Sequence, residues 1–123
     1  VVSAGPTTSI RMEIFEPDFM EEFGTKIFIG KGGMGEKTSA ALEKYGDVYA
    51  QFTGGAGSLM AGSVEEVIDV YFLEELGVPE AVWLLEVVEF GPLLVTMDST
   101  GKSIHRDISE EVDLNLAREL ETL

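Results

Sequence analysis

Cysteine is absent from the 123 residues of this chain. Its absence excludes disulfide bonds, zinc sites built on thiolates and cysteine nucleophiles. It also excludes iron-sulfur ligation by this chain through the usual thiolate ligands. Any metal chemistry in which the chain takes part must therefore use ligands from elsewhere.

Basic residues are scarce, with eight lysines and arginines against 23 aspartates and glutamates and a formal net charge of −15. Nucleic acids and anionic membranes are bound by neutralising lysines and arginines, so the composition argues against both as partners. Residues 1–46 hold five of the eight basic residues against seven acids, whereas residues 47–123 hold three against sixteen. The first third is therefore suited to binding an anion. The remainder predicts an acidic surface that is either solvated or faces a basic partner.

Long hydrophobic runs are also missing. No stretch of about 18 or more uncharged apolar residues occurs, so the sequence predicts no membrane span. The opening residues Val1–Ala4 lack the basic and apolar regions of a signal peptide, and a cytoplasmic location is the resulting expectation. With 45% apolar residues the chain can bury one core. We predict a single domain over residues 1–123.

The chain does contain short apolar runs that alternate with helical patterns. Helices are predicted over residues 17–23, 36–45 and 55–61. Strands are predicted over residues 25–29, 48–52, 67–72, 81–88 and 93–97. The early strand-helix-strand order argues for an α/β fold, and the strand-rich second half argues against a purely parallel sheet. We expect a mixed sheet with flanking helices.

The end of the chain predicts a hairpin followed by a helix. The segment Asp98–Gly101 has the residues of a tight turn, which would join residues 93–97 to a short strand at Lys102–His105. Asp107 followed by Glu110 fits a capping box, and apolar residues then keep helical spacing. This predicts an amphipathic terminal helix over residues 107–123. Its apolar stripe is typical of a helix that packs on its own domain, and docking on a partner is the alternative.

A glycine-rich loop at residues 30–35 follows a predicted strand and opens a predicted helix, as a phosphate-binding loop does. The Walker spacing fails, because Glu36 stands where the lysine should be and would repel phosphate. Lys37 comes one residue late, which turns it about 100° around the helix. Nucleotide hydrolysis is therefore disfavoured. The glycines still allow amides to approach a carboxylate beside Lys31; a plain strand-to-helix turn with an exposed lysine is the alternative.

A second loop, Ser3–Glu13, gathers small residues, hydroxyl side chains and Arg11. The planar fork of an arginine binds a carboxylate through two hydrogen bonds, and threonine hydroxyls can donate or accept beside it. This loop therefore predicts an anion clamp. The alternative is a turn in which serine and threonine cap the next segment and Arg11 pairs with Glu13 or a neighbouring acid.

Two further patterns are weaker signals. The tripeptide His105–Asp107 is that of the protein kinase catalytic loop, but the downstream asparagine spacing and the aspartate-phenylalanine-glycine motif are absent. The single histidine is therefore expected at the surface or near a helix cap. Glu86 and Glu89 could be imagined as the paired carboxylates of a glycosidase, but at strand spacing they face opposite sides. We predict a polar strand edge.

Seven segments form a common pattern: Gly5-Pro6-Thr7-Thr8-Ser9-x-Arg11-Met12, Ile29-Gly30-Lys31-Gly32, Tyr49 with Thr53-Gly54-Gly55-Ala56, Leu73–Gly77, Glu80–Trp83, Glu86–Phe90 and Met97-Asp98-x-x-Gly101. This pattern resembles the β subunit, or C-terminal domain, of class I (iron-sulfur) fumarate hydratases. The β subunit of L-tartrate dehydratase is a close relative, and the motifs do not separate the two.

The resemblance implies a swivelling type of α/β domain and the reversible hydration of fumarate to L-malate. It implies a 4Fe-4S cluster held by an iron-sulfur α subunit in a hetero-oligomer, and not by this chain. In the family pattern the arginine and the lysine of the two loops hold the carboxylates of a small dicarboxylate, which transfers to Arg11 and Lys31. The first threonine is a candidate proton-transfer group, which transfers to Thr7. Thr8 and Gly32 belong to the same motifs and are expected at the substrate.

The chain departs from the family pattern at both ends. The family has a further upstream segment with an arginine-aspartate motif and a later histidine, and this chain begins after it, so we expect its own clamp to be incomplete. The helix at residues 107–123 extends past the usual family end, and the sequence gives it no function. A ligand-binding or assembly module without catalysis is the alternative from a different class.

Overall fold

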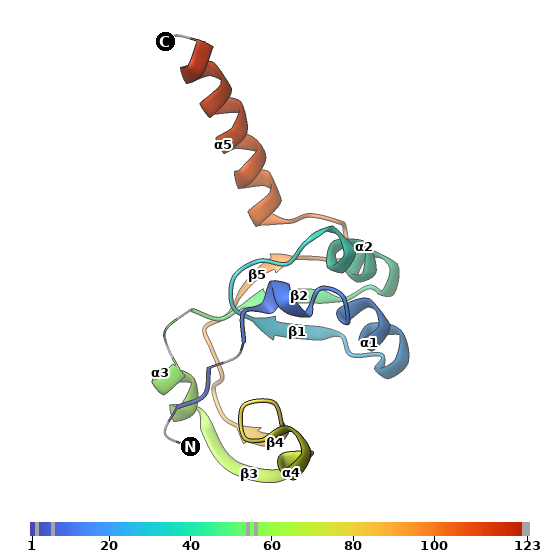
Figure 1. Cartoon of the computed structure of the whole chain (residues 1–123), viewed down its shortest axis with the longest axis vertical. Helices are drawn as coiled ribbons and strands as arrows, with labels where there is room; N and C mark the ends of the chain where they lie inside the picture. The colour runs from blue at the N-terminus through green and yellow to red at the C-terminus, as the bar shows by residue number, and fades with distance from the viewer. Residues whose placement is uncertain (2, 6, 54, 56, 122–123) are drawn as a thin grey trace. The chain divides into compact units, whose positions relative to one another are not determined.

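The computed structural model describes residues 1, 3–5, 7–53, 55 and 57–121. They form two compact units. One, the sheet unit, consists of Pro6–Phe52 and Leu93–Leu123, and the other, the hairpin unit, consists of Val1–Gly5 and Thr53–Pro92. Figure 1 labels the helices and strands of both. The single domain over residues 1–123 stays a prediction.

The sheet unit is built on a three-stranded mixed sheet in the order β1-β2-β5 (Figure 1). The strands β1 (Ile27–Gly30) and β2 (Val48–Gln51) are parallel, and β5 (Leu94–Met97) runs antiparallel to β2. A helix connects β1 to β2, because parallel neighbours need a crossover connection. The predicted α/β fold with a mixed sheet and flanking helices is thereby confirmed.

The helices α1 (Glu16–Phe23) and α2 (Glu36–Tyr45) pack against each other. Each ends at a glycine in the left-handed conformation, Gly24 with φ 62° and Gly46 with φ 74°. Glycine adopts this conformation without the steric penalty of a β-carbon, which explains why both helices stop at these residues. The sequence predicted α2 with these bounds and α1 to within one residue.

The core of the sheet unit lies between these two helices and the strands. Met20 of α1, Leu42 of α2 and Tyr49 of β2 belong to one buried cluster together with Met97 of β5. Tyr49 is 1% exposed and Leu42 is 0% exposed. Burying a large apolar side chain contributes about 1.5–3 kcal/mol relative to leaving it in water. The ring of Tyr49 is therefore firmly held, which fixes the position of its hydroxyl.

The hairpin unit contains α3 (Gly57–Gly62) and an antiparallel pair of strands, β3 (Val64–Tyr71) and β4 (Val82–Val87). The short helix α4 (Leu73–Leu76) lies between the strands in sequence. The helix predicted at 55–61 is confirmed from Gly57 onward, and the strands predicted at 67–72 and 81–88 are confirmed, although β3 begins at Val64. Residues 54 and 56, which belong to the motif after Tyr49, lie outside the described residues.

The prediction that Glu86 and Glu89 lie on one strand and face opposite sides of it is wrong. Glu86 lies in β4, opposite Glu66 of β3. Glu89 lies beyond the end of β4 and has a φ of 51°. The two carboxylates therefore do not share a strand, and alternation along a strand does not relate them. Both are exposed, as expected of a polar edge.

The turn at Asp98–Gly101 is confirmed, but the strand predicted after it at Lys102–His105 is wrong. The Asp98 Oδ1 atom accepts hydrogen bonds from the amide and the hydroxyl of Thr100 at 2.8 and 2.6 Å. Beyond the turn a single β-bridge pairs Met97 with Ser103, and no named strand follows within the described residues.

The strand predicted at Lys102–His105 is absent because Ser103 starts the helix α5 (Ile104–Glu121). Its hydroxyl accepts the amide of Arg106 at 3.3 Å, and its carbonyl accepts the amide of Asp107 at 3.0 Å. A serine in this position satisfies amides that the first helical turn leaves without partners. Asp107 is consequently not the cap. It lies in the first turn of α5, where its charge complements the helix dipole.

The helix α5 has no buried residue. Its large apolar side chains are between 41% exposed, at Ile104, and 61% exposed, at Leu114. The apolar stripe is therefore not a core face within the described part of the chain, and residues 122 and 123 of the predicted helix lie outside that part. None of the described helices is long and apolar enough to cross a membrane.

Candidate functional site

The two loops singled out by the sequence meet at the carboxyl end of β1, in the sheet unit. The first is the short 3-10 helix η1 (Ser9–Met12), which Thr7 and Thr8 precede. The second runs from Lys31 to Gly35, between β1 and α2. The amide of Lys31 donates a hydrogen bond of 2.9 Å to Ser9 Oγ, which joins the loops directly. The carboxyl end of parallel strands is where α/β sheets place their ligand-binding loops.

Gly30 makes this approach possible. It is buried, and a β-carbon at this position would overlap the Ser9 hydroxyl and would lie 2.5 Å from the hydroxyl oxygen of Tyr49. Real β-carbons essentially never come so close to a neighbour. The glycine at the end of β1 is therefore required for contact between the loops, rather than for an unusual backbone angle.

Tyr49 closes a ring of hydrogen bonds behind the glycine loop. Its hydroxyl donates to the carbonyl of Gly32 at 3.1 Å and also interacts with the side chain of Ser9. Because the one phenolic proton goes to Gly32, Ser9 donates to the Tyr49 oxygen while it accepts the Lys31 amide. The pKa of the Tyr49 phenol is raised by burial, lowered in part by Ser9, and raised again by the charge of Glu16. The phenol is therefore protonated at neutral pH and remains a donor.

Glu13 holds the other end of the glycine loop. Its carboxylate accepts the amides of Gly35, Lys37 and Thr38 at 2.7, 2.8 and 3.3 Å, and the hydroxyl of Thr38 at 2.8 Å. Amides at the start of a helix have no partner within it, and the helix dipole favours a negative charge there. Burial alone would raise the pKa of Glu13, but the bonds from Thr38, Gly35 and Lys37 lower it. Glu13 is thus a remote N-terminal cap for α2.

The cap bears on one alternative that the sequence left open, the pairing of Arg11 with Glu13. Glu13 serves α2 rather than Arg11, and no ion pair of Arg11 occurs among the described residues. The start of α2 cannot take a phosphate as it stands, since a carboxylate already binds its amides. Among the amides of the glycine loop, those of Lys31 and Gly35 bind within the protein.

The predicted site residues are accessible to a ligand. Thr7, Thr8, Arg11 and Gly32 are exposed, and Lys31 is half-buried. Thr8 precedes η1 and accepts the Arg11 amide through its carbonyl at 3.1 Å, while its side chain makes no capping bond. Within the described residues neither Arg11 nor Lys31 is paired with a carboxylate. Cations without internal partners are suited to binding an anionic ligand.

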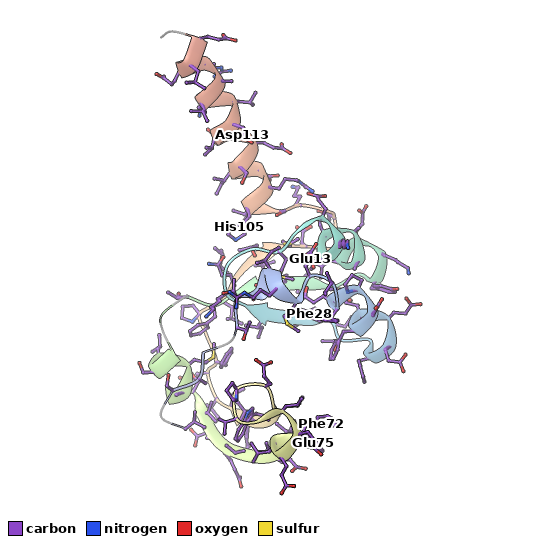
Figure 2. All side chains as sticks on the ribbon, in the orientation of Figure 1. Glu13, Phe28, Phe72, Glu75, His105 and Asp113 are labelled. Carbon is purple, nitrogen blue, oxygen red and sulfur yellow. The ribbon has the colours of Figure 1, made fainter. Side chains whose placement is uncertain are left out.

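His105 lies beside the glycine loop (Figure 2), although the sequence assigned it only a surface or capping role. Its Nε2 atom is 3.0 Å from Gln51 Oε1, at the end of β2, so this nitrogen donates the hydrogen bond. The ring packs against Gly33, where a β-carbon would lie 2.7 Å from the His105 Cδ2 atom. His105 thus supports the loop from the side of α5. In the structure His105 therefore both packs against the loop and is hydrogen-bonded to β2.

Four residues of this arrangement were not identified as functional by sequence reasoning. They are Ser9, Glu13, Tyr49 and His105. Ser9 and Tyr49 did appear in the family motifs, which was the one available signal. Nothing local in the sequence distinguishes Glu13 from other acidic side chains, because its partners lie 22 to 25 residues away.

The described part of the chain offers no metal site. It contains no group of three or more histidine, cysteine, aspartate or glutamate side chains that could hold an ion. The sequence has no cysteine. The residues of this chain therefore do not fit the ligation of an iron-sulfur cluster.

The mixed sheet and its two joined loops define an α/β domain with accessible cations at a strand end. Residues 1–108 match the family described as the fumarase C-terminus. The match covers most of the 123 residues, and the chain belongs to this family.

Three relatives carry names that describe hydro-lyases. A protein of Methanocaldococcus jannaschii, provisionally named L(+)-tartrate dehydratase subunit beta, is 50% identical over 111 residues, which are 90% of this chain and 57% of that protein. One of Geobacillus stearothermophilus, provisionally named fumarate hydratase class I, is 49% identical over 89% of this chain and 21% of its own length. The L(+)-tartrate dehydratase subunit beta of Escherichia coli is 45% identical over 85% of this chain and 51% of its own length. The chain thus spans about half the length of the two beta subunits.

Proposed function

We propose that this chain is the substrate-gripping β subunit or domain of an iron-sulfur hydro-lyase that hydrates fumarate reversibly to L-malate. The observation that carries the proposal is the hydrogen bond between Lys31 and Ser9, because it joins the loop of Lys31 to the loop of Arg11. Membership of the fumarase C-terminus family supports the reaction class.

The chemistry of the loops suits a small dicarboxylate. Such a substrate carries two negative charges, and a chain of net charge −15 can bind it only through local cations and backbone amides. Arg11 supplies a planar fork for one carboxylate, and Lys31 supplies a compact charge for the other. Holding both ends fixes the orientation of the carbons between them.

The other loop residues complete the proposed site. Thr8 and Gly32 lie next to the two cations in sequence and are exposed, so they would line the bound substrate. Thr7 is the proposed proton-transfer group. Its hydroxyl can donate and accept, which is what moving a proton to or from a reacting carbon requires.

The cluster chemistry would come from a partner. We place the 4Fe-4S cluster on an iron-sulfur α subunit in a cytoplasmic hetero-oligomer. In this assembly the chain closes over the α subunit as a swivelling domain. Two of the relatives are named as beta subunits, which supports an assembly of unlike chains. When bound, the cluster would supply Lewis acidity for the departing hydroxyl. The part of this chain is to bind and orient the substrate.

Dehydration of L-tartrate is the second candidate. It is supported by identities of 50% and 45% to proteins named as tartrate dehydratase subunits, against 49% to one named as a fumarate hydratase. Both kinds of name therefore occur at nearly the same identity to this chain.

A substrate panel on the assembled enzyme tests both reactions. The values of kcat/KM for fumarate, L-malate and L-tartrate would be measured under the same conditions. We expect fumarate and L-malate to be the better substrates. A higher kcat/KM for L-tartrate would replace fumarase by tartrate dehydratase. Absence of all three reactions, with malate still binding in a calorimetric titration, would indicate a dicarboxylate-binding or assembly module.

A further inference from the structure

We propose that Ser9 and Tyr49 are positioning residues that set the backbone of Lys31 and Gly32 for a substrate carboxylate. This inference rests on the proposed function and extends it to two residues that do not themselves touch the substrate. It concerns the ring of hydrogen bonds that runs from the Lys31 amide through Ser9 and Tyr49 to the Gly32 carbonyl.

The glycine loop needs such a restraint. Four of its six residues, at positions 30, 32, 33 and 35, are glycines, which have more backbone freedom than any other residue. Gly32 uses that freedom, with a φ of 74°. A lysine in so flexible a segment would sample many positions and would lose entropy when it binds a ligand. Restraints from outside the loop reduce that loss.

Of the hydrogen bonds that restrain the loop, those of the ring are adjacent to Lys31. Glu13 holds Gly35 at the far end. Ser9 and Tyr49 hold the residues on either side of the peptide bond between Lys31 and Gly32, since one bond reaches the Lys31 amide and the other the Gly32 carbonyl. The orientation of this part of the loop is therefore set by two side-chain hydroxyls.

Both hydroxyls come from rigid positions. Tyr49 is 1% exposed and lies in the core, and Ser9 is 7% exposed at the start of η1. A functional group is held precisely when its supporting side chains are themselves locked by packing. Ser9 also lies two residues before Arg11. The short helix η1 therefore carries both Arg11 and the hydroxyl that restrains the loop of Lys31. The relative placement of Arg11 and Lys31 thus depends on Ser9.

The experiment compares Tyr49→Phe and Ser9→Ala with the wild type in the assembled hydro-lyase. Tyr49→Phe removes one oxygen and preserves the buried ring, so it should fold. Tyr45→Phe is the matched control, because the Tyr45 hydroxyl binds Lys44 and Glu21 rather than the glycine loop. The readouts are kcat, KM for fumarate, and the inhibition constant of succinate, a dicarboxylate that cannot be hydrated. Thermal unfolding followed by circular dichroism checks the fold of each variant.

We expect KM and the succinate inhibition constant to rise about 2- to 12-fold in Tyr49→Phe and in Ser9→Ala, which is the effect of losing the one hydrogen bond that each side chain makes to the glycine loop. The value of kcat should change less, and Tyr45→Phe should match the wild type. If Ser9 and Tyr49 only stabilised the fold, the variants would have a lower unfolding temperature, and KM would not change more than kcat. Wild-type succinate affinity in both variants would overturn the inference, as would an equal loss in Tyr45→Phe.

Lys31→Ala separates this inference from the proposed function. If Lys31→Ala loses affinity for succinate while Tyr49→Phe and Ser9→Ala do not, the proposed function stands and the positioning role is wrong. If the wild-type assembly neither converts the substrates nor binds succinate, the proposed function fails, and the positioning role fails with it.

Discussion

The carboxylate of Glu13 accepts both the backbone amide and the hydroxyl of Thr38, at 3.3 and 2.8 Å. A second carboxylate, that of Glu16, lies 3.1 Å from the same hydroxyl. One hydroxyl proton can serve only one acceptor at a time. The bonds to Glu13 outweigh its burial and lower its pKa, whereas burial raises the pKa of Glu16, helped by the charge of Glu13 and opposed by Thr38. Two neighbouring acids are therefore expected to affect stability in opposite directions.

Replacing these two acids by glutamine tests this difference. Glu13→Gln should lower the free energy of unfolding at neutral pH by about 1–2 kcal/mol, because it weakens a charged cap on α2. Glu16→Gln should have no cost or should stabilise the protein, because it removes a charge that burial disfavours. Urea unfolding measures both, with the exposed Glu22→Gln as a control for loss of one negative charge. Equal losses in the Glu13 and Glu16 variants would contradict the assignment of the cap.

The two acids also predict the pH dependence of stability. The folded pKa of Glu13 is below its ordinary value of 4.5, so its contribution is fully present above that value. That contribution is lost as the pH falls through the folded pKa. The folded pKa of Glu16 is above 4.5, so Glu16 costs stability once the pH rises through it, and has no such cost below 4.5.

Unfolding measured from about pH 7 down to about pH 3 would reveal both effects. The deficit of Glu13→Gln relative to the wild type should shrink as the pH falls. Any advantage of Glu16→Gln should be present at about pH 7 and absent at about pH 4. A deficit of Glu13→Gln that stays constant across this range would mean that the ionised carboxylate is not what stabilises α2.

Local signals account for the parts of the fold that the sequence predicted well. The bounds of α2 follow from Gly35 before it and Gly46 after it, together with its apolar spacing. The failure at Lys102–His105 has a local cause as well. Ser103 caps the helix one turn earlier than Asp107, so the residues after the turn begin α5 instead of a strand.

The tertiary parts of the site were beyond prediction from local pattern. The motifs identified Arg11 and Lys31, but only the structure brings Ser9 to Lys31 and Glu13 to Gly35, across 22 residues in each case. The exposure of α5 was not predictable either. A periodic apolar stripe shows that a helix has an apolar face and does not show what, if anything, covers it.

The source of the iron provides a further prediction. The purified 123-residue chain should contain no stoichiometric iron and should show no hydratase activity, because it has no thiolate to hold a cluster. Iron analysis and a fumarate hydration assay on the pure chain would measure this. The positive control is the same assay after an iron-sulfur α subunit and the expected upstream segment of the family are supplied. Turnover by the pure chain with bound iron would refute the assignment of the cluster to a partner subunit.

The last prediction concerns Arg11 and Lys31, which lie on the two joined loops and have no carboxylate partner among the described residues. In the proposed site each makes a charge-assisted hydrogen bond to a substrate carboxylate, and such bonds contribute about 1.5–3 kcal/mol. Arg11→Ala and Lys31→Ala should therefore lower kcat/KM by about tenfold to a hundredfold or more. Arg11→Lys should be nearly as damaging as Arg11→Ala, because lysine cannot reproduce the planar fork.

Lys37→Ala is the matched control for these variants. It removes a lysine from the start of α2 but retains the backbone amide that Glu13 binds, so kcat/KM should stay near the wild-type value. Steady-state kinetics of the assembled enzyme compare the four variants, and circular dichroism confirms that each is folded. Wild-type kcat/KM in Arg11→Ala or Lys31→Ala would refute the placement of the substrate on these loops. A loss in Lys37→Ala larger than in both would instead place the substrate at the start of α2, where Glu13 would have to give way to it.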